Sequence, residues 1–148
     1  MTNFYFWLKF GHLAGLAAFL FGHGIAAGCS YGLRRHRTPG ADRALLQLSV
    51  WSSRIAYPGL LLLIATGIGM GFAGHWWGQG WIWASVAILV ALFVGMGLIS
   101  LPYHRARDAG DDDTALYQQL DRTRPITAAW MGGAGLVGLI LLMVFKPF

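Results

Sequence analysis

Four long apolar runs dominate the chain, at residues 10–33, 55–73, 81–101 and 126–145. Each run is close to the roughly 20 helical residues that a membrane hydrocarbon core requires. Little sequence remains outside these runs to form a soluble domain. The pattern therefore predicts an all-α protein, an integral membrane four-helix up-and-down transmembrane bundle, in which residues 1–148 form a single transmembrane domain.

The amino-acid composition supports the prediction of an integral membrane protein. Hydrophobic residues make up 56% of the 148-residue chain, and charged residues make up 11%. Soluble globular domains usually contain about 25% charged residues, so the composition argues against that class. The lipid bilayer is therefore the first expected partner.

The positive charges carry a topology signal. The net charge is +5, but the arginines gather in two of the three connectors, while residues 74–80 contain neither Lys nor Arg. The positive-inside rule places these Arg-rich connectors in the cytoplasm and both termini outside. Because the charges flank helices and do not cover one face, we expect no nucleic-acid partner. The arginines are Arg34, Arg35, Arg37, Arg43 and Arg54 in the first group, and Arg105, Arg107, Arg122 and Arg124 in the second.

The connectors also contain turn and helix-start signals. Thr38-Pro39-Gly40 predicts a turn, and Asp42 is placed to cap a short amphipathic helix that lies in the interface or extends the second span. Tryptophans at positions 76, 77, 81 and 83 predict an interfacial hairpin between the second and third spans. In the last connector, the acidic run 111–113 predicts the cap of a short helix.

Two histidines stand inside the first apolar run. His12 and His23 are eleven residues apart, so on a helix they lie within ~20° of each other and ~16 Å apart along the axis. Both are therefore expected to face the same neighbour. Ionisable side chains at membrane depth are costly, which makes them candidate functional residues.

A ridge of small residues runs beside the histidines on the same predicted helix. Such a ridge allows the backbone of another helix to approach closely, or allows a flat cofactor to lie against the helix. Both interpretations remain open from the sequence. The small-residue ridge consists of Gly11, Gly15, Ala18 and Gly22.

Several short motifs occur together in the chain. They are Trp7-Leu8-Lys9-Phe10-Gly11-His12, Arg54-Ile55-Ala56-Tyr57-Pro58 followed by Ala65-Thr66-Gly67, the aromatic hairpin, and the terminal Lys146-Pro147-Phe148. With them the chain resembles a family of small, uncharacterised bacterial integral-membrane proteins. That family is distantly similar to the copper-resistance D (CopD) membrane domain and to HemJ, a haem-binding protoporphyrinogen oxidase with four membrane helices.

The resemblance implies a place in the bacterial cytoplasmic (inner) membrane. It also implies that His12 matches the haem-associated histidine of HemJ, and that Arg54 matches an arginine at the start of its second helix. The third helix of HemJ opens with a lysine, whereas this chain has Trp83-Ala84-Ser85-Val86-Ala87 there. Protoporphyrinogen oxidation therefore does not follow from a shared fold. A non-enzymatic role is favoured, with a HemJ-like oxidoreductase as the enzymatic alternative.

A b-type haem is the leading cofactor prediction. Haem iron in a helix bundle needs an inward imidazole beside small residues, and His12 meets both conditions. His75 in the outer hairpin is a candidate second ligand. Arg54 is a candidate partner for a propionate, but it enters from the cytoplasmic side and so suits a haem near His23. The function implied is electron transfer or porphyrin handling.

Two alternatives to haem remain. Imidazole and thioether groups also suit copper, with His12 and His23 as candidate metal ligands. In the second alternative there is no cofactor, and the histidines bond carbonyl groups of other helices. The protein would then be a scaffold or an accessory subunit, forming a homo-oligomer or joining a larger membrane complex through its glycine-rich faces.

Overall fold

Long helices account for nearly all of the structure, a computed structural model that describes residues 2–35 and 37–147. The helices are α1 (Thr2–Arg35), α2 (Pro39–Ala73), α3 (Gly80–Asp108), α4 (Asp113–Leu120) and α5 (Pro125–Phe145), with a 3-10 helix, η1 (Trp76–Gly78), between α2 and α3. Four of them, α1, α2, α3 and α5, are long and apolar enough to cross a membrane. The described residues contain no strand. The predicted all-α fold with four transmembrane helices is confirmed.

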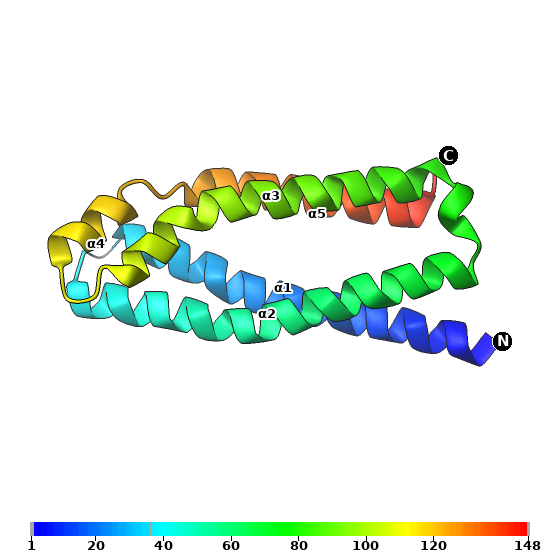
Figure 1. Ribbon diagram of the computed structural model, residues 1–148, viewed down its shortest axis with the longest axis horizontal. Coiled ribbons are helices and arrows are strands. Elements are labelled where there is room, and N and C mark those ends of the chain that lie inside the picture. The colour runs from blue at the N-terminus through cyan, green and yellow to red at the C-terminus, as the bar shows by residue number, and fades with distance from the viewer. Residues whose placement is uncertain (1, 36, 148) are drawn as a thin grey trace.

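The four transmembrane helices associate as two pairs (Figure 1). Helix α1 crosses α2, while α3 runs beside α5, and most contacts between transmembrane helices lie within these pairs. Both ends of the chain lie at the same end of the molecule, and α4 lies at the opposite end. The chain therefore runs up and down through the helices in order, as the apolar pattern predicts.

Three helices extend well beyond their apolar runs, and α1 does so by beginning at Thr2. Helix α2 begins at Pro39, so the amphipathic segment of the first connector extends the second transmembrane helix. Proline is suited to the first turn because that position needs no amide hydrogen bond. Helix α3 continues past Pro102 to Asp108. An internal proline is tolerated in a transmembrane helix, where neighbouring groups satisfy the carbonyl that it leaves free.

One of the two predicted helix caps is correct. The Asp112 carboxylate accepts hydrogen bonds from the amides of Thr114 and Ala115, at 2.9 and 3.0 Å, and caps α4. Asp42, in contrast, lies inside the first turn of α2, and Thr38 takes the N-cap position. The prediction for Asp42 is wrong because Pro39 starts the helix three residues earlier.

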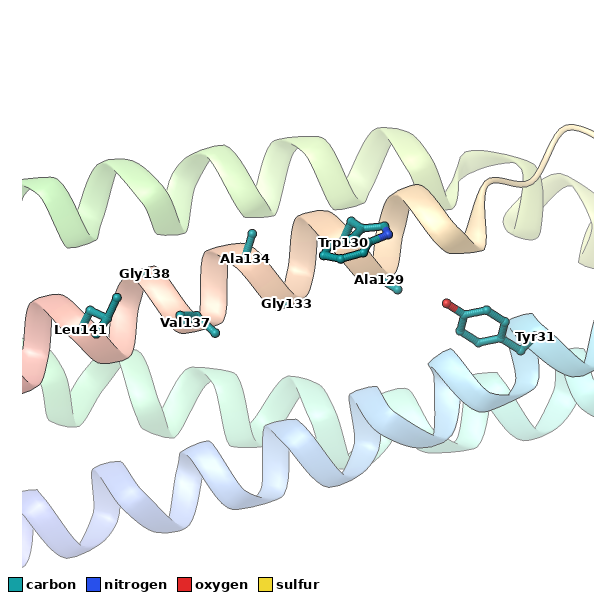
Figure 2. A pocket seen from close by; sticks show the side chains of 8 residues that line it. All are labelled: Tyr31, Ala129, Trp130, Gly133, Ala134, Val137, Gly138 and Leu141. Carbon is teal, nitrogen blue, oxygen red and sulfur yellow. The ribbon is translucent and has the colours of Figure 1, made fainter.

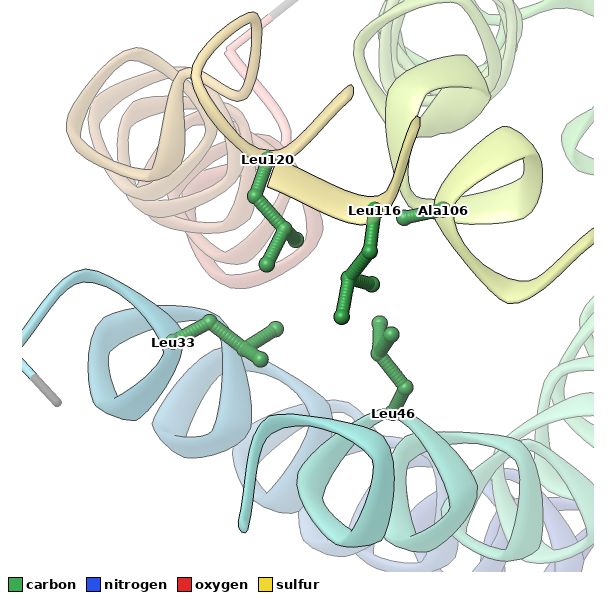
Figure 3. Packing of buried hydrophobic residues seen from close by; sticks show 5 residues of the cluster. All are labelled: Leu33, Leu46, Ala106, Leu116 and Leu120. Carbon is green, nitrogen blue, oxygen red and sulfur yellow. The ribbon is translucent and has the colours of Figure 1, made fainter. Parts of the chain in front are cut away.

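The fully buried apolar cluster lies at the Arg-rich end and not at membrane depth (Figure 3). It joins α1, α2, α3 and α4 through Leu33, Leu46, Ala106, Leu116 and Leu120. Lipid tails are as apolar as leucine, so burial against protein is driven by the hydrophobic effect only where water is present. The apolar side chains nearer the membrane centre therefore face lipid. No residue in the most apolar stretch of α5 is buried inside the protein.

Aromatic residues close the opposite end of the molecule. His75 adopts a left-handed backbone conformation, with φ 54°, where the chain turns from α2 into η1. The Trp76 ring lies 6.0 Å from the Tyr5 ring, centroid to centroid, and Lys146 Nζ lies 4.1 Å from the Trp76 ring centroid. The hairpin predicted from the tryptophans therefore contacts residues near both ends of the chain.

Candidate functional site

His12 lies in the interface between α1 and α2. Its Nδ1 is 2.9 Å from the carbonyl oxygen of Leu63 and 3.4 Å from Thr66 Oγ1. A Cβ at Gly67 would lie 3.2 Å from His12 Cε1, so the glycine leaves room for the ring. With its proton on Nδ1, His12 donates to Leu63 and keeps Nε2 as an acceptor. This bond links two helices, and a bond of the same kind orients imidazoles that bind metals.

The small-residue ridge brings the backbones of α1 and α2 into contact. A Cβ at Gly15 would lie 2.7 Å from the amide nitrogen of Leu63, and a Cβ at Gly22 would lie 2.7 Å from the carbonyl oxygen of Ser52. Real Cβ contacts are not this short, so neither position has room for a side chain. The ridge is therefore occupied by α2, and a flat cofactor does not lie against it.

His23 faces a different helix from His12. Its ring stacks on Phe19, with centroids 5.4 Å apart and an interplanar angle of 20°. Its Nε2 lies 4.0 Å from the position that a Cβ would take at Gly132 of α5. The expectation that both histidines face the same neighbour is wrong. Because α1 crosses α2 (Figure 1), one line of residues along α1 does not stay opposite a single helix.

Arg54 lies at the level of His23 but on the other side of α2. Gly22 of α1 packs against Ser52 and Ala56 of α2, which lie two positions before and two positions after Arg54. Two positions correspond to about 200° around a helix, so Arg54 points away from α1. Its side chain is exposed, and its guanidinium carbon lies 4.1 Å from the Trp51 ring centroid. The structure does not bring Arg54 and His23 together.

His75 is exposed in the turn before η1, well separated along α2 from the residues that contact His12. Within residues 2–35 and 37–147, no group of three or more His, Cys, Asp or Glu side chains converges to hold a metal ion. The four predicted site residues are thus distributed among the α1/α2 interface, the face of α1 toward α5, the outer surface of α2, and a loop.

An apolar groove of ≈ 810 Å³ lies between α5 and the inner part of α1 (Figure 2). Gly133 and Trp130 belong to its α5 wall, and Tyr31 borders it from α1. Gly132, which lies beside His23, directly precedes Gly133 of this wall in the sequence. Cofactor pockets usually measure about 300–1,000 Å³. The groove is therefore large enough for a flat apolar ligand, and His23, which does not line it, lies opposite Gly132 at the edge of its α5 wall.

Sequence reasoning missed the groove residues Tyr31 and Trp130. The available signal was that each is a large aromatic side chain with small residues one turn away in an apolar run. That pattern is common on lipid-facing helices, so it does not distinguish a groove from a bilayer contact. Only the placement of α5 opposite α1 brings the two side chains to one site (Figure 2).

A buried polar contact at the Arg-rich end was also missed. The Asp42 side chain is 0% exposed, and its Oδ2 accepts a hydrogen bond of 3.0 Å from the Tyr117 hydroxyl. Its Oδ1 has no hydrogen-bond partner in the described part of the chain. Burial, followed by the hydrogen bond to Asp42, raises the pKa of Tyr117, so the phenol remains a donor at neutral pH. The contact joins α2 to α4.

Two ion pairs hold the last connector to the first. Arg43 Nη2 lies 2.8 Å from Asp113 Oδ1, and Arg37 pairs with Asp121. The hydrogen bond from Arg37 lowers the pKa of Asp121. A lowered carboxyl pKa stabilises the fold at pH values above the ordinary Asp pKa, and this contribution is lost as the pH falls below that pKa and through the lowered one. Both groups are exposed, so solvent screening keeps the contribution small.

Comparison with known proteins places the whole chain in one family. No curated protein and no solved structure matches the chain. A family model described as "Predicted integral membrane protein (DUF2269)" matches residues 6–147, a range that includes α2, α3 and α5 and all but the first four residues of α1. The similarity to HemJ and to the CopD membrane domain stays a prediction. The chain therefore belongs to the DUF2269 family of integral membrane proteins.

Proposed function

We propose that this integral membrane protein binds b-type haem between its two helix pairs, and that His23 would hold the iron. The observation that carries the proposal is the free imidazole edge of His23. Phe19 stacks on the ring, Nε2 faces α5 beside Gly132, and no hydrogen bond joins the ring to another described residue. An oriented imidazole with an unused nitrogen that faces a glycine of the opposite helix meets the requirement for a haem ligand.

The surrounding residues fit an apolar planar group. The glycines of α5 leave space opposite α1, and Trp130 provides an aromatic surface on the groove wall. Bound there, a haem would supply a one-electron redox couple, which agrees with a role in electron transfer or porphyrin handling. His12 is the alternative ligand, because its bond to Leu63 leaves Nε2 available. Arg54 would reach a propionate only from the outer side of α2.

Absorption spectra test this proposal. The protein is purified after expression with ample haem, and spectra are recorded after air oxidation and after reduction with dithionite. We expect a Soret band that His23→Ala abolishes and that the matched variant His12→Ala retains. A band lost only in His12→Ala would move the iron to His12, and wild-type protein without a band would refute haem binding. Metal analysis of the same sample tests the copper alternative.

A second candidate function is assembly through α1. Gly24 and Gly28 form a small-xxx-small pair on α1, and apart from the neighbouring backbone of α1 itself no described atom lies within 4 Å of the Cβ position of either. Such a pair permits close approach of a helix from another chain. A colourless preparation that forms a defined oligomer, and that Gly28→Leu converts to monomer, would favour a scaffold over a haem protein. A strictly monomeric preparation would count against it.

We also propose that the Arg-rich end faces the cytoplasm and that both termini lie outside the inner membrane. The support is the clustering of arginines near α4 and the common location of the two chain ends (Figure 1). A reporter that is active only in the cytoplasm, fused after residue 148, is expected to be inactive. The same reporter inserted at Gly110, between α3 and α4, should be active. The reverse pattern would invert the topology.

A further inference from the structure

A second, smaller groove lies at the Arg-rich end of the α3/α5 pair. It measures ≈ 220 Å³ and is lined by Leu98, Ile99 and Pro102 of α3, together with Arg122 and Arg124 of the connector between α4 and α5. One wall is therefore apolar, and the other is formed by two arginine residues. Leu98 and Ile99 lie within the apolar run of α3, so the groove extends from the charged end of the molecule toward the hydrocarbon region.

Neither arginine of this groove forms a salt bridge with a carboxylate in the described part of the chain. The salt bridges found among residues 2–35 and 37–147 join Arg37 to Asp121 and Arg43 to Asp113. Asp121 directly precedes Arg122 in sequence, but the Asp121 carboxylate forms its salt bridge with Arg37. The neighbouring negative charge is therefore already neutralised, and an anion entering the groove would meet two unpaired cations.

The start of α5 adds to this preference. Arg124 immediately precedes α5, and no side chain of the described structure caps the amides of its first turn. The N-terminal end of a helix carries partial positive charge and favours anions. This effect acts in the same direction as the two guanidinium groups, which form strong charge-assisted hydrogen bonds with phosphate oxygens.

We propose that this groove binds an anionic phospholipid. The phosphodiester pairs with Arg122 and Arg124, and an acyl chain lies along Leu98 and Ile99. A basic site between transmembrane helices at the bilayer surface has the chemistry that recognises anionic headgroups. The apolar wall distinguishes this ligand from a small soluble anion, which would gain nothing from contact with leucine and isoleucine side chains.

Native mass spectrometry of the full chain in detergent tests this site. The protein is incubated with phosphatidylglycerol or with phosphatidylcholine of the same acyl chains. We expect retention of phosphatidylglycerol by the wild-type protein, weakened roughly 30-fold in Arg122→Gln/Arg124→Gln, given the usual contribution of an arginine near a membrane surface. The control Arg34→Gln/Arg35→Gln removes the same charge at the same end and should bind like the wild type.

Each other outcome overturns the proposal. Equal losses in both double variants would indicate general charge attraction, and equal retention of both lipids would show that the headgroup is not recognised. Displacement of the lipid by millimolar inorganic phosphate would identify a site for a free anion. The single variants Arg122→Gln and Arg124→Gln, each expected to weaken binding roughly fivefold, decide the question if the double variant does not fold.

Discussion

Replacing Gly15 with alanine should destabilise the protein by about 2 kcal/mol, although alanine is the better helix former. The added Cβ would lie 2.7 Å from the Leu63 amide nitrogen and 2.8 Å from the Gly59 carbonyl oxygen. Both atoms belong to the α2 backbone, so no rotamer change can relieve the overlap. The helices α1 and α2 must separate instead, which weakens the packing along the whole small-residue ridge and strains the bond between His12 and Leu63.

Gly97→Ala is the matched control for this prediction. Gly97 lies inside α3, and apart from the neighbouring backbone of α3 itself no described atom lies within 4 Å of its Cβ position. The same substitution there changes helix propensity without creating an overlap, so it should leave stability unchanged or raise it by up to about 1 kcal/mol. Thermal unfolding in a mild detergent, followed by circular dichroism, measures both effects. Equal midpoints for the two variants would show that α1 and α2 do not pack this closely.

Replacing Tyr117 with phenylalanine should lower the unfolding midpoint by about 5 °C. The Tyr117 hydroxyl donates to Asp42 Oδ2 at 3.0 Å, and Asp42 Oδ1 already has no partner in the described part of the chain. Loss of the hydroxyl leaves the carboxyl group, which is 0% exposed, without any side-chain hydrogen bond. Burying an unpartnered polar group costs far more than the net value of one hydrogen bond.

Two further variants separate this contact from general effects of the substitution. Tyr57→Phe is the control, because Tyr57 is exposed on α2 and should tolerate the change. In a double-mutant cycle, adding Tyr117→Phe to Asp42→Ala should lower the midpoint no further, since the bond is already absent. Additive losses in the cycle would contradict a direct contact between the two side chains.

His23 shows how much of the site could be predicted from sequence. Its presence in an apolar run marked it as a candidate, and the 3.6-residue period placed it near the line of His12. That period describes one helix only. It does not say that His12 would bond Leu63 of α2 while His23 would lie beside Gly132 of α5, since this depends on the angle at which α1 crosses α2.

Asp42 and Arg54 illustrate the same limit for charged residues. From the sequence, Asp42 was interpreted by its distance to a predicted helix start, and Arg54 by the resemblance to HemJ and by the predicted topology. Asp42 is instead buried against Tyr117, 75 residues away in the chain, and Arg54 lies on the outer side of α2. Contacts between residues so distant in sequence depend on how the helices pack, and local pattern carries no information about that packing.

The sequence by itself determined the features that depend on the bilayer. Hydrocarbon thickness sets the length of an apolar run, and the need to satisfy backbone hydrogen bonds within the membrane selects helices. The four spans, the all-α class and the cap at Asp112 follow from such local rules. These rules need no knowledge of which helix is the neighbour of which.

Only the tertiary structure decided how the helices pair and where the grooves lie. Lipid solvates an apolar helix face as well as a protein neighbour does, so hydrophobicity does not select partners inside the membrane. Pairing depends on shape, as where Gly15 and Gly22 allow the α2 backbone to approach, and on the apolar cluster at the Arg-rich end (Figure 3). The groove between α1 and α5 exists because packing is close within each helix pair and looser between the pairs, whereas the groove beside Arg122 lies at the end of the α3/α5 pair.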